Sequence, residues 1–241
     1  MKAMLIDENK NFVWSDVAEP VVGAHDVCIE IHAAALNRAD LLQRQGKYPS
    51  PEGCPPWMGL EVAGIVRETG AEVSRWRRGD RVCALLGGGG YAEAVAVNEG
   101  MVMPIPGNLT FEEAASLPEA YATCYLNLFR EGGYRPGETL FFPAGASGLA
   151  SVGIPMAKAF GAYVITSVLT DEIAEKIAPL HADRIIVSAR EDTAQVVRRE
   201  AENGRPIDVA IDCLAGETIG QCFPYVNEGC RWARRSLPRC A

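Results

Sequence analysis

The sequence predicts an α/β protein in which a β-rich first half is followed by a half built on a parallel sheet. In the first half, short apolar runs are separated by turns rich in glycine and proline, a pattern typical of a compact barrel of short strands. From Thr139 onward, apolar runs alternate with helical segments, which is typical of a parallel sheet covered on both faces. The rhythm changes near residue 105, where Pro104 and Pro106 indicate an extended linker.

Apolar runs predict the strands of the first half. Residues 27–33 and 91–97 alternate between apolar and polar positions as half-buried strands do, and residues 62–66 and 81–85 are further apolar runs. Residues 87–90 are consecutive glycines, which cannot hold a regular element and therefore predict a loop.

Helix signals follow the linker. Thr110 and Glu113 have the spacing of a capping box, so we expect a helix through residues 114–115 that stops before Pro118, and a second helix over residues 120–130. Further along, we expect strands at 139–142, 163–166, 184–187 and 208–212, separated by helices at 151–160, 171–180 and 193–201.

Composition excludes several function classes. The 241 residues carry a formal net charge of -8, which disfavours nucleic acid as a partner. No run reaches the roughly 20 apolar residues that span a membrane, and the start of the chain turns acidic too soon for a signal peptide. We therefore expect no membrane association and a cytoplasmic location. The eight cysteines form no C-x-x-C pair and are interpreted as buried or half-buried thiols.

The main chemical signal is a turn of small residues after the strand at 139–142. Gly145, Ser147 and Ala150 occupy the slots of a G-x-G-x-x-G dinucleotide fingerprint, with Gly148 between them. Small side chains there let the backbone approach a pyrophosphate at a helix N-terminus. A tight helix–sheet turn without a ligand is the alternative. The candidate cofactor contacts in this turn are Gly145, Ala146, Ser147, Gly148 and Leu149.

The end of the strand at 163–166 bears on which nicotinamide cofactor binds. A site for NADH places Asp or Glu there to hold the ribose hydroxyls. This chain has Ser167 instead, whose hydroxyl could hydrogen-bond the 2′-phosphate of NADPH, although Asp171 and Glu172 follow and no Lys or Arg stands at 166–173. We therefore expect NADPH to be preferred, with Ser167 as a further cofactor contact.

Six segments are ALNRAD (35–40), QRQGKYP (43–49), GLEVAG (59–64), PIP (104–106), AASLPEA (114–120) and GASG (145–148). Together they resemble the zeta-crystallin-type quinone oxidoreductases of the medium-chain dehydrogenase/reductase superfamily. Within this family, the likeness is greatest to the tumour-suppressor-inducible subgroup. It covers roughly residues 1–229, and the combination of segments is specific although any one alone is not.

The resemblance implies a GroES-like β-barrel catalytic domain over residues 1–118 and a Rossmann-type dinucleotide-binding domain over residues 119–241. It also implies NADPH as cofactor, a quinone or enone substrate facing it between the domains, and a homodimer if the C-terminus is complete. Alcohol dehydrogenases of the superfamily carry a Cys where this chain has Asn37 and a His where it has Leu60. With two expected ligands replaced, the resemblance implies a site without metal.

By the family's pattern, Asn37 and Tyr48 line the substrate side and are the candidate catalytic residues. Tyr48 could donate a hydrogen bond to a quinone or enone carbonyl oxygen, or it could be a surface aromatic. Thr123 matches a family threonine near the nicotinamide, with an ordinary helix residue as the alternative. Cys124 is interpreted as a packing residue rather than a nucleophile, because no base is identifiable beside it.

Two departures from the family lie around the turn of small residues at 144–150, which is called the phosphate turn below. Ala150 replaces the last glycine, and its methyl group is expected to crowd the helix against the strand. Pro155 lies inside the same helix, where proline costs about 3 kcal/mol or produces a kink. Ile173 and Ser188 stand near the family's basic residue and tyrosine for the 2′-phosphate.

The third departure is the C-terminal tail. After Trp232, basic and breaker residues at 233–241 replace an apolar strand, and the chain then ends short of the family's length. We expect a frameshift or premature stop, with a genuine arginine-rich tail as the alternative. The second domain would then have a sheet of four strands that is incomplete at its C-terminal edge.

These observations predict a zinc-independent, NADPH-dependent oxidoreductase that transfers a hydride or electrons to a quinone. The sequence does not separate this activity from NADPH-dependent reduction of an enone or enoyl double bond, because both need the same cofactor pose. A non-catalytic, truncated NADPH-binding protein is the hypothesis from another class.

Overall fold

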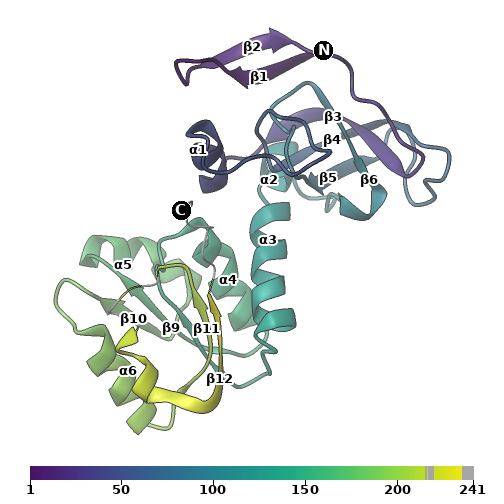
Figure 1. The fold of residues 1–241 in the computed structure, drawn as a ribbon. Coiled ribbons are helices and arrows are strands. Elements are labelled where there is room, and N and C mark those ends of the chain that lie inside the picture. Colours follow the sequence, from purple (N-terminus) through teal and green to yellow (C-terminus); the bar gives the residue numbers. More distant parts are fainter. Residues whose placement is uncertain (215, 217–219, 235–241) are drawn as a thin grey trace. The chain divides into compact units, whose positions relative to one another are not determined.

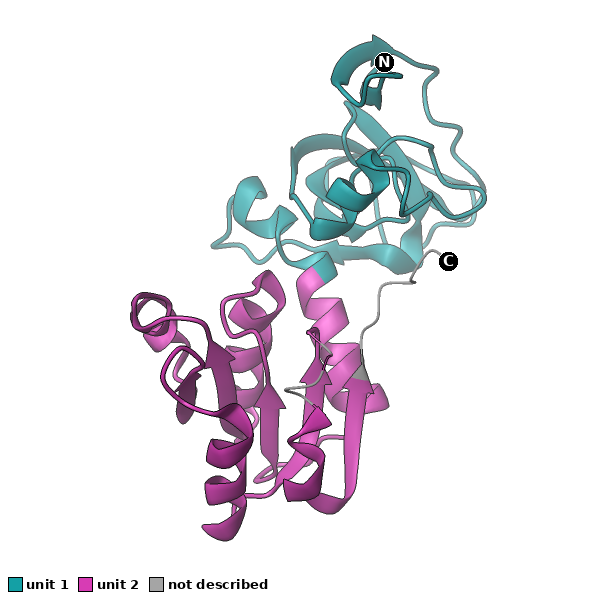
Figure 2. Cartoon of the chain, turned by 60° about the vertical axis from the view of Figure 1, so that its left-hand side comes forward, with its two compact units in different colours: residues 1–119 teal, residues 120–241 magenta. Residues whose placement is uncertain are grey.

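The computed structural model describes residues 1–214, 216 and 220–234. The chain divides into two compact units, Met1–Glu119 and Ala120–Ala241, which Figure 2 distinguishes by colour. Unit 1 consists mainly of strands, whereas unit 2 alternates strands with helices. The α/β fold class predicted from the sequence is therefore confirmed.

Unit 1 is organised around an antiparallel sheet in the order β6-β3-β4-β5-β7. Figure 1 labels β3 to β6 of this sheet. Apolar side chains from all five strands pack into one core, which includes Ile29, Val62, Val82, Val95 and Val102. The predicted glycine loop at 87–90 separates β5 from β6. The strands are β3 (Asp26–Ala34), β4 (Glu61–Thr69), β5 (Arg81–Leu85), β6 (Ala94–Asn98) and β7 (Val102–Pro104).

The predicted capping box is present at the start of α2 (Phe111–Ala115). The backbone N–H of Glu113 donates to the Thr110 hydroxyl at 3.2 Å, and the N–H of Thr110 donates to the Glu113 carboxylate at 2.9 Å. Two orphan donors are thereby satisfied, which fixes where this short helix begins.

Several elements of unit 1 were not predicted from the sequence. They include the antiparallel hairpin of β1 (Lys2–Ile6) and β2 (Phe12–Asp16), the short strand β7, which ends where a linker was expected, and the helix α1 (Arg38–Arg44). The hairpin has its own small sheet and is joined to the segment before β6 by an isolated bridge between Ala3 and Ala92. The helix α1 has only two turns, so the helical spacing of apolar residues does not repeat often enough in the sequence to be recognised.

Unit 2 contains a parallel sheet in the order β10-β9-β8-β11-β12. Leu140 and Phe142 of the central strand belong to the core shared with α4 (Gly148–Ala159), whereas Phe141 belongs to the core shared with α6 (Thr193–Glu202). Both faces of the sheet are thus covered, as predicted. The strands are β8 (Thr139–Phe142), β9 (Tyr163–Val168), β10 (Arg184–Val187), β11 (Ile207–Asp212) and β12 (Val226–Arg234).

The remaining helices of unit 2 are α3 (Pro118–Tyr125), which starts in unit 1 and continues as a π-helical turn at Leu126–Glu131, and α5 (Asp171–Ile177). Helix α4 runs without interruption through Pro155, which is exposed. The carbonyl that loses its helical partner there, that of Ser151, also belongs to an exposed residue, where water can replace the N–H. Among the described residues, no helix is long and apolar enough to cross a membrane.

The expectation that the sheet of unit 2 stops after four strands is wrong. Strand β12 pairs in parallel with β11, including the positions from Arg231 to Arg234. The guanidinium of Arg231 forms an ion pair with Glu138 at 2.5 Å and donates to the Gly132 carbonyl at 2.8 Å, and the Trp232 ring packs against Phe141. The Arg231 guanidinium is therefore accommodated by residues that are near it in space but far away in the sequence. The rest of the predicted tail, residues 235–241, lies outside the described residues.

Strands β3 and β4 approach each other closely at Gly64. We therefore predict that this position cannot carry a side chain. A Cβ atom there would lie 1.9 Å from the Glu30 carbonyl oxygen. We expect Gly64→Ala to lower the free energy of unfolding by about 3 kcal/mol or to prevent folding, because backbone must shift. Urea denaturation measures this. Gly107→Ala is the control, because a Cβ at Gly107 meets nothing within 4 Å; equal midpoints for both variants would contradict the prediction.

Candidate functional site

The turn between β8 and α4 is held tightly against β9. Ala144 adopts a left-handed conformation with φ 62°, which is uncommon for a residue with a side chain. The backbone N–H of Gly145 donates to the Ser167 carbonyl at 2.8 Å. Ser147 then caps α4, because its hydroxyl accepts from the Ala150 N–H at 3.1 Å. The first turn of α4 is therefore presented from a fixed backbone, and its remaining N–H groups have no helical acceptor.

The two glycines of this turn have different roles. A Cβ on Gly145 would lie 2.5 Å from the Thr166 hydroxyl oxygen, so Gly145 is needed for packing of the turn on β9. A Cβ on Gly148 would meet nothing within 4 Å, so the protein itself does not require glycine there. Open space beside the first residue of α4 is what close approach of a pyrophosphate requires.

The expected crowding at Ala150 is resolved by a residue that the sequence analysis did not single out. Ala150 is fully buried in the core between α4 and the sheet. The tightest approach along α4 lies at Gly153, where a Cβ would be 2.4 Å from the Phe142 ring and 3.1 Å from the Cys124 sulfur. The glycine needed for close helix–strand packing is therefore one turn further along α4. Its signal in the sequence was a second small residue at helical spacing from Ala150.

Thr123 lies in α3, which packs beside the phosphate turn. The neighbouring Cys124 is fully buried and its thiol donates to the Leu149 carbonyl at 3.3 Å. Asn127 donates its side-chain N–H to the Thr123 carbonyl at 2.7 Å, one turn later. The structure thus brings the helix that carries Thr123 to the first turn of α4. Burial of Cys124 agrees with its interpretation as a packing residue.

Ser167 lies near the carboxyl end of β9, the strand beside β8. Its side chain is buried, and its carbonyl accepts the hydrogen bond from Gly145. The preceding Thr166 donates its hydroxyl to the Phe142 carbonyl at 2.6 Å, at the end of β8. Ser167 and the phosphate turn are therefore brought together at the carboxyl edge of the parallel sheet, where ligands of such sheets bind.

In unit 1, Asn37 is held by a buried carboxylate. The side-chain N–H of Asn37 donates to one oxygen of Glu61 at 2.8 Å, and the other oxygen of Glu61 accepts from the Glu119 backbone N–H at 2.8 Å. Burial raises the pKa of the Glu61 carboxyl above its ordinary value, against the lowering effect of these two hydrogen bonds. Glu61 therefore fixes both the Asn37 amide and the first turn of α3.

A second buried acid lies on the other side of Asn37. One oxygen of Asp40 accepts from the Asn37 backbone N–H at 2.6 Å and from the Tyr91 hydroxyl at 2.8 Å. The other oxygen is buried and has no partner among the described residues. Burial, and then the Asp40 carboxylate, raise the pKa of the Tyr91 hydroxyl. Asp40, Glu61 and Tyr91 were not predicted as site residues, although a Glu at the start of an apolar run was a signal.

Tyr48 follows α1 and is half-buried. Its hydroxyl makes no hydrogen bond to another described residue. The loop around it is shaped by Gln43, which donates to the Ser50 hydroxyl at 2.8 Å. The hydroxyl of Tyr48 is thus available to an external acceptor, whereas the amide of Asn37 already has one.

The residues at the positions of the superfamily's zinc ligands do not fit zinc. Leu60 is buried and has no donor atom, and the Asn37 amide nitrogen is engaged by Glu61. The described part of the chain contains no group of three or more His, Cys, Asp and Glu side chains that could hold a metal ion.

Comparison with protein families matches both units. Residues 23–107 match the alcohol dehydrogenase GroES-like domain, and residues 148–234 match the family described as zinc-binding dehydrogenase. A quinone oxidoreductase-like protein 2 homolog of Nematostella vectensis is 33% identical over 208 residues. The match covers 85% of this chain but 56% of that protein, so the chain spans little more than half the length of this relative.

Solved structures similar to this chain include quinone oxidoreductases and an enoyl reductase. The quinone oxidoreductase of Pseudomonas syringae pv. Tomato DC3000 is 30% identical with a TM-score of 0.78, over 93% of this chain and 69% of that one. The quinone oxidoreductase of Thermus thermophilus, also solved in complex with NADPH, is 29% identical with a TM-score of 0.78, over 96% and 72%. The CurK enoyl reductase is 25% identical with a TM-score of 0.87, over 97% and 73%.

The contact between Tyr91 and Asp40 predicts a measurable loss of stability on removal of one hydroxyl. We expect Tyr91→Phe to lower the free energy of unfolding by about 1–3 kcal/mol, because a buried carboxylate loses a donor. Urea denaturation followed by tryptophan fluorescence measures it. Tyr48→Phe is the matched control, since its hydroxyl bonds no described residue. The prediction fails if the two variants have the same midpoint.

Proposed function

The chain belongs to the quinone oxidoreductase family of the medium-chain dehydrogenase/reductase superfamily, and on this basis we propose that it is a zinc-independent, NADPH-dependent reductase of quinones. The observation that carries the proposal is the phosphate turn: a backbone tied to β9, a capped α4, and open space at Gly148. An anion is favoured there by the N–H groups and dipole of the helix N-terminus.

The proposed cofactor contacts lie in unit 2. The N–H groups at the start of α4 hold the pyrophosphate, and Ser167 faces the adenosine ribose at the end of β9. Thr123 lies on the nicotinamide side, on the helix that packs against Leu149. When bound, NADPH supplies the hydride or electrons, and the protein supplies orientation and polarity. The contacts are Thr123, Gly145, Ala146, Ser147, Gly148, Leu149 and Ser167.

The proposed catalytic residues lie in unit 1. An amide nitrogen carries two N–H donors, and Glu61 uses one of those of Asn37, so the second can donate to a substrate oxygen. The hydroxyl of Tyr48 is a further donor. Two donors aimed at a carbonyl oxygen stabilise the negative charge that develops as the quinone is reduced, which is the task that zinc performs in a metal-dependent relative. Glu61 is a positioning residue, because it orients the amide without touching substrate.

Reduction of an enone or enoyl double bond is the second candidate, favoured by the similarity to the CurK enoyl reductase. The same donors would then stabilise an enolate oxygen while the hydride goes to the β-carbon. The two reactions use the same cofactor and differ only in the molecule that accepts the hydride. Assays with different acceptors therefore distinguish them, whereas assays with different cofactors do not.

The proposal is tested by steady-state oxidation of NADPH by the chain with a panel of ortho- and para-quinones, alongside enones and enoyl thioesters at equal concentration. Turnover with quinones and not with the double-bond substrates supports quinone reduction. Turnover with enones or enoyl thioesters alone assigns the second candidate. Binding of NADPH without turnover of any acceptor indicates a non-catalytic NADPH-binding protein and rejects both.

The role of Tyr48 predicts a selective kinetic defect. We expect Tyr48→Phe to lower kcat/KM for the accepted quinone by about tenfold or more, because one donor to the developing oxyanion is lost. The Kd for NADPH and the unfolding midpoint should stay unchanged. Tyr225→Phe, at a half-buried tyrosine of unit 2, is the control. An unaltered kcat/KM in Tyr48→Phe would show that the ring is only a surface aromatic.

A further inference from the structure

The segment around the end of β9 contains no Lys or Arg at 166–173. The fold brings a basic residue to this strand end from elsewhere in the chain. Beyond its last paired residue, the segment after β10 continues alongside the segment after β9: the Ser188 N–H donates to the Val168 carbonyl at 2.9 Å, and the Ala189 N–H donates to the Leu169 carbonyl at 3.2 Å. The next residue is Arg190. A cation is thereby placed beside the strand end that carries Ser167.

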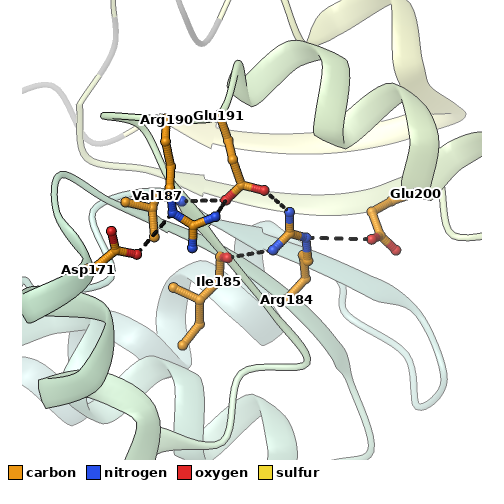
Figure 3. Close-up of polar contacts among 7 residues, drawn as sticks. All are labelled: Asp171, Arg184, Ile185, Val187, Arg190, Glu191 and Glu200. Carbon is orange, nitrogen blue, oxygen red and sulfur yellow. Dashed lines mark hydrogen bonds and ion pairs between the residues drawn. The ribbon is translucent and has the colours of Figure 1, made fainter.

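The guanidinium of Arg190 contacts the segment that follows β9 directly. Its Nε donates to a carboxylate oxygen of Asp171 at 3.0 Å (Figure 3). Both side chains are well exposed, at 59% for Arg190 and 65% for Asp171. An exposed pair of this kind contributes little to stability and exchanges partners readily. One terminal nitrogen lies 3.9 Å from Glu191, which is too far for a hydrogen bond, so the donors of both terminal nitrogens can reach another anion.

A network of half-buried charges fixes the turn that carries Arg190 (Figure 3). One carboxylate oxygen of Glu191 accepts from the Val187 N–H at 3.0 Å, and the other is paired with Arg184, which also lies 3.9 Å from Glu200. The hydrogen bond from Val187, and then Arg184, hold the pKa of Glu191 below its ordinary value. Glu191 thus stays charged, and the main chain at Arg190 is held in place.

We propose that Arg190 recognises the 2′-phosphate of the dinucleotide, with Ser167 as a neutral hydrogen-bonding neighbour and Asp171 as the resting partner that the phosphate replaces. The inference rests on the proposed function, since it assumes that the dinucleotide lies across the ends of β8 and β9. The planar guanidinium of Arg190 carries several N–H donors. A phosphate offers these donors more oxygen acceptors and more negative charge than the Asp171 carboxylate does.

The same geometry admits the opposite assignment, in which Asp171 itself accepts from the ribose hydroxyls of NADH and Arg190 holds it in position. The strand itself favours the phosphate, because the residue at the position where an NADH site needs an acid is Ser167. The two assignments predict opposite effects for the same substitutions.

The test is a set of binding titrations on the full chain with NADPH and NADH, and with 2′,5′-ADP and 5′-AMP, which differ in the 2′-phosphate. We expect Arg190→Gln to weaken NADPH and 2′,5′-ADP by about tenfold, because a charge-assisted hydrogen bond is lost, and to leave NADH and 5′-AMP unchanged. Arg190→Lys should retain part of the preference, because the charge remains. Asp171→Asn should tighten NADPH. The control is Arg198→Gln, at an arginine of similar exposure that is paired with Glu202.

An unchanged ratio of NADPH to NADH affinity in Arg190→Gln, with both dinucleotides still bound, overturns the inference and leaves the proposed function standing. Weaker NADH binding in Asp171→Asn assigns the opposite role and also overturns it. Failure of the unaltered chain to bind either dinucleotide rejects the proposed function and, with it, the assignment of Arg190.

Discussion

The hydrogen bond from the Gly145 N–H to the Ser167 carbonyl is the contact on which the cofactor side of this protein depends. It joins the turn after β8 to the end of β9, and it is possible only because Gly145 has no Cβ to meet Thr166. The capped start of α4, the open space at Gly148 and the position of Ser167 all follow from it. Close packing of the turn on the neighbouring strand thus fixes the backbone before any ligand is considered.

In unit 1, hydrogen bonds to buried carboxylates hold Asn37 in place, as close packing holds the turn in unit 2. Asn37 lies between two buried acids, and both its backbone and its side chain donate to them. Burial raises the pKa of the Glu61 carboxyl group, whereas the two hydrogen bonds that it accepts lower this pKa. The same two hydrogen bonds fix the position of the carboxyl group. Where a metal-dependent relative would place a cation, this chain has Leu60 and an amide held in one orientation. The proposed substrate donors consequently rely on hydrogen bonding alone.

Features set by local sequence could be predicted, whereas those set by long-range contacts could not. The capping box at Thr110 and the strands β3 to β6 and β8 to β11 were anticipated, because each depends on neighbouring residues. Strand β12 was missed because the expectation rested on the basic and breaker residues from 233 onward, whereas the strand covers Val226–Arg234 and pairs with β11. Its Arg231 is paired with Glu138, which lies far away in the sequence. The roles of Gly153 and Arg190 depend likewise on which strands and helices become neighbours. Assignments of Asn37, Tyr48 and Thr123 to a reaction remain predictions.

We propose that the turn between β8 and α4 holds the dinucleotide, and amide hydrogen exchange of the chain with and without NADPH tests this placement. We expect slower exchange at the free N–H groups of Gly148 and Leu149, and in the segment after Ser167, when NADPH is added. Unchanged exchange at these amides, under conditions where NADPH is bound, would contradict it, because the dinucleotide would then lie elsewhere on the molecule.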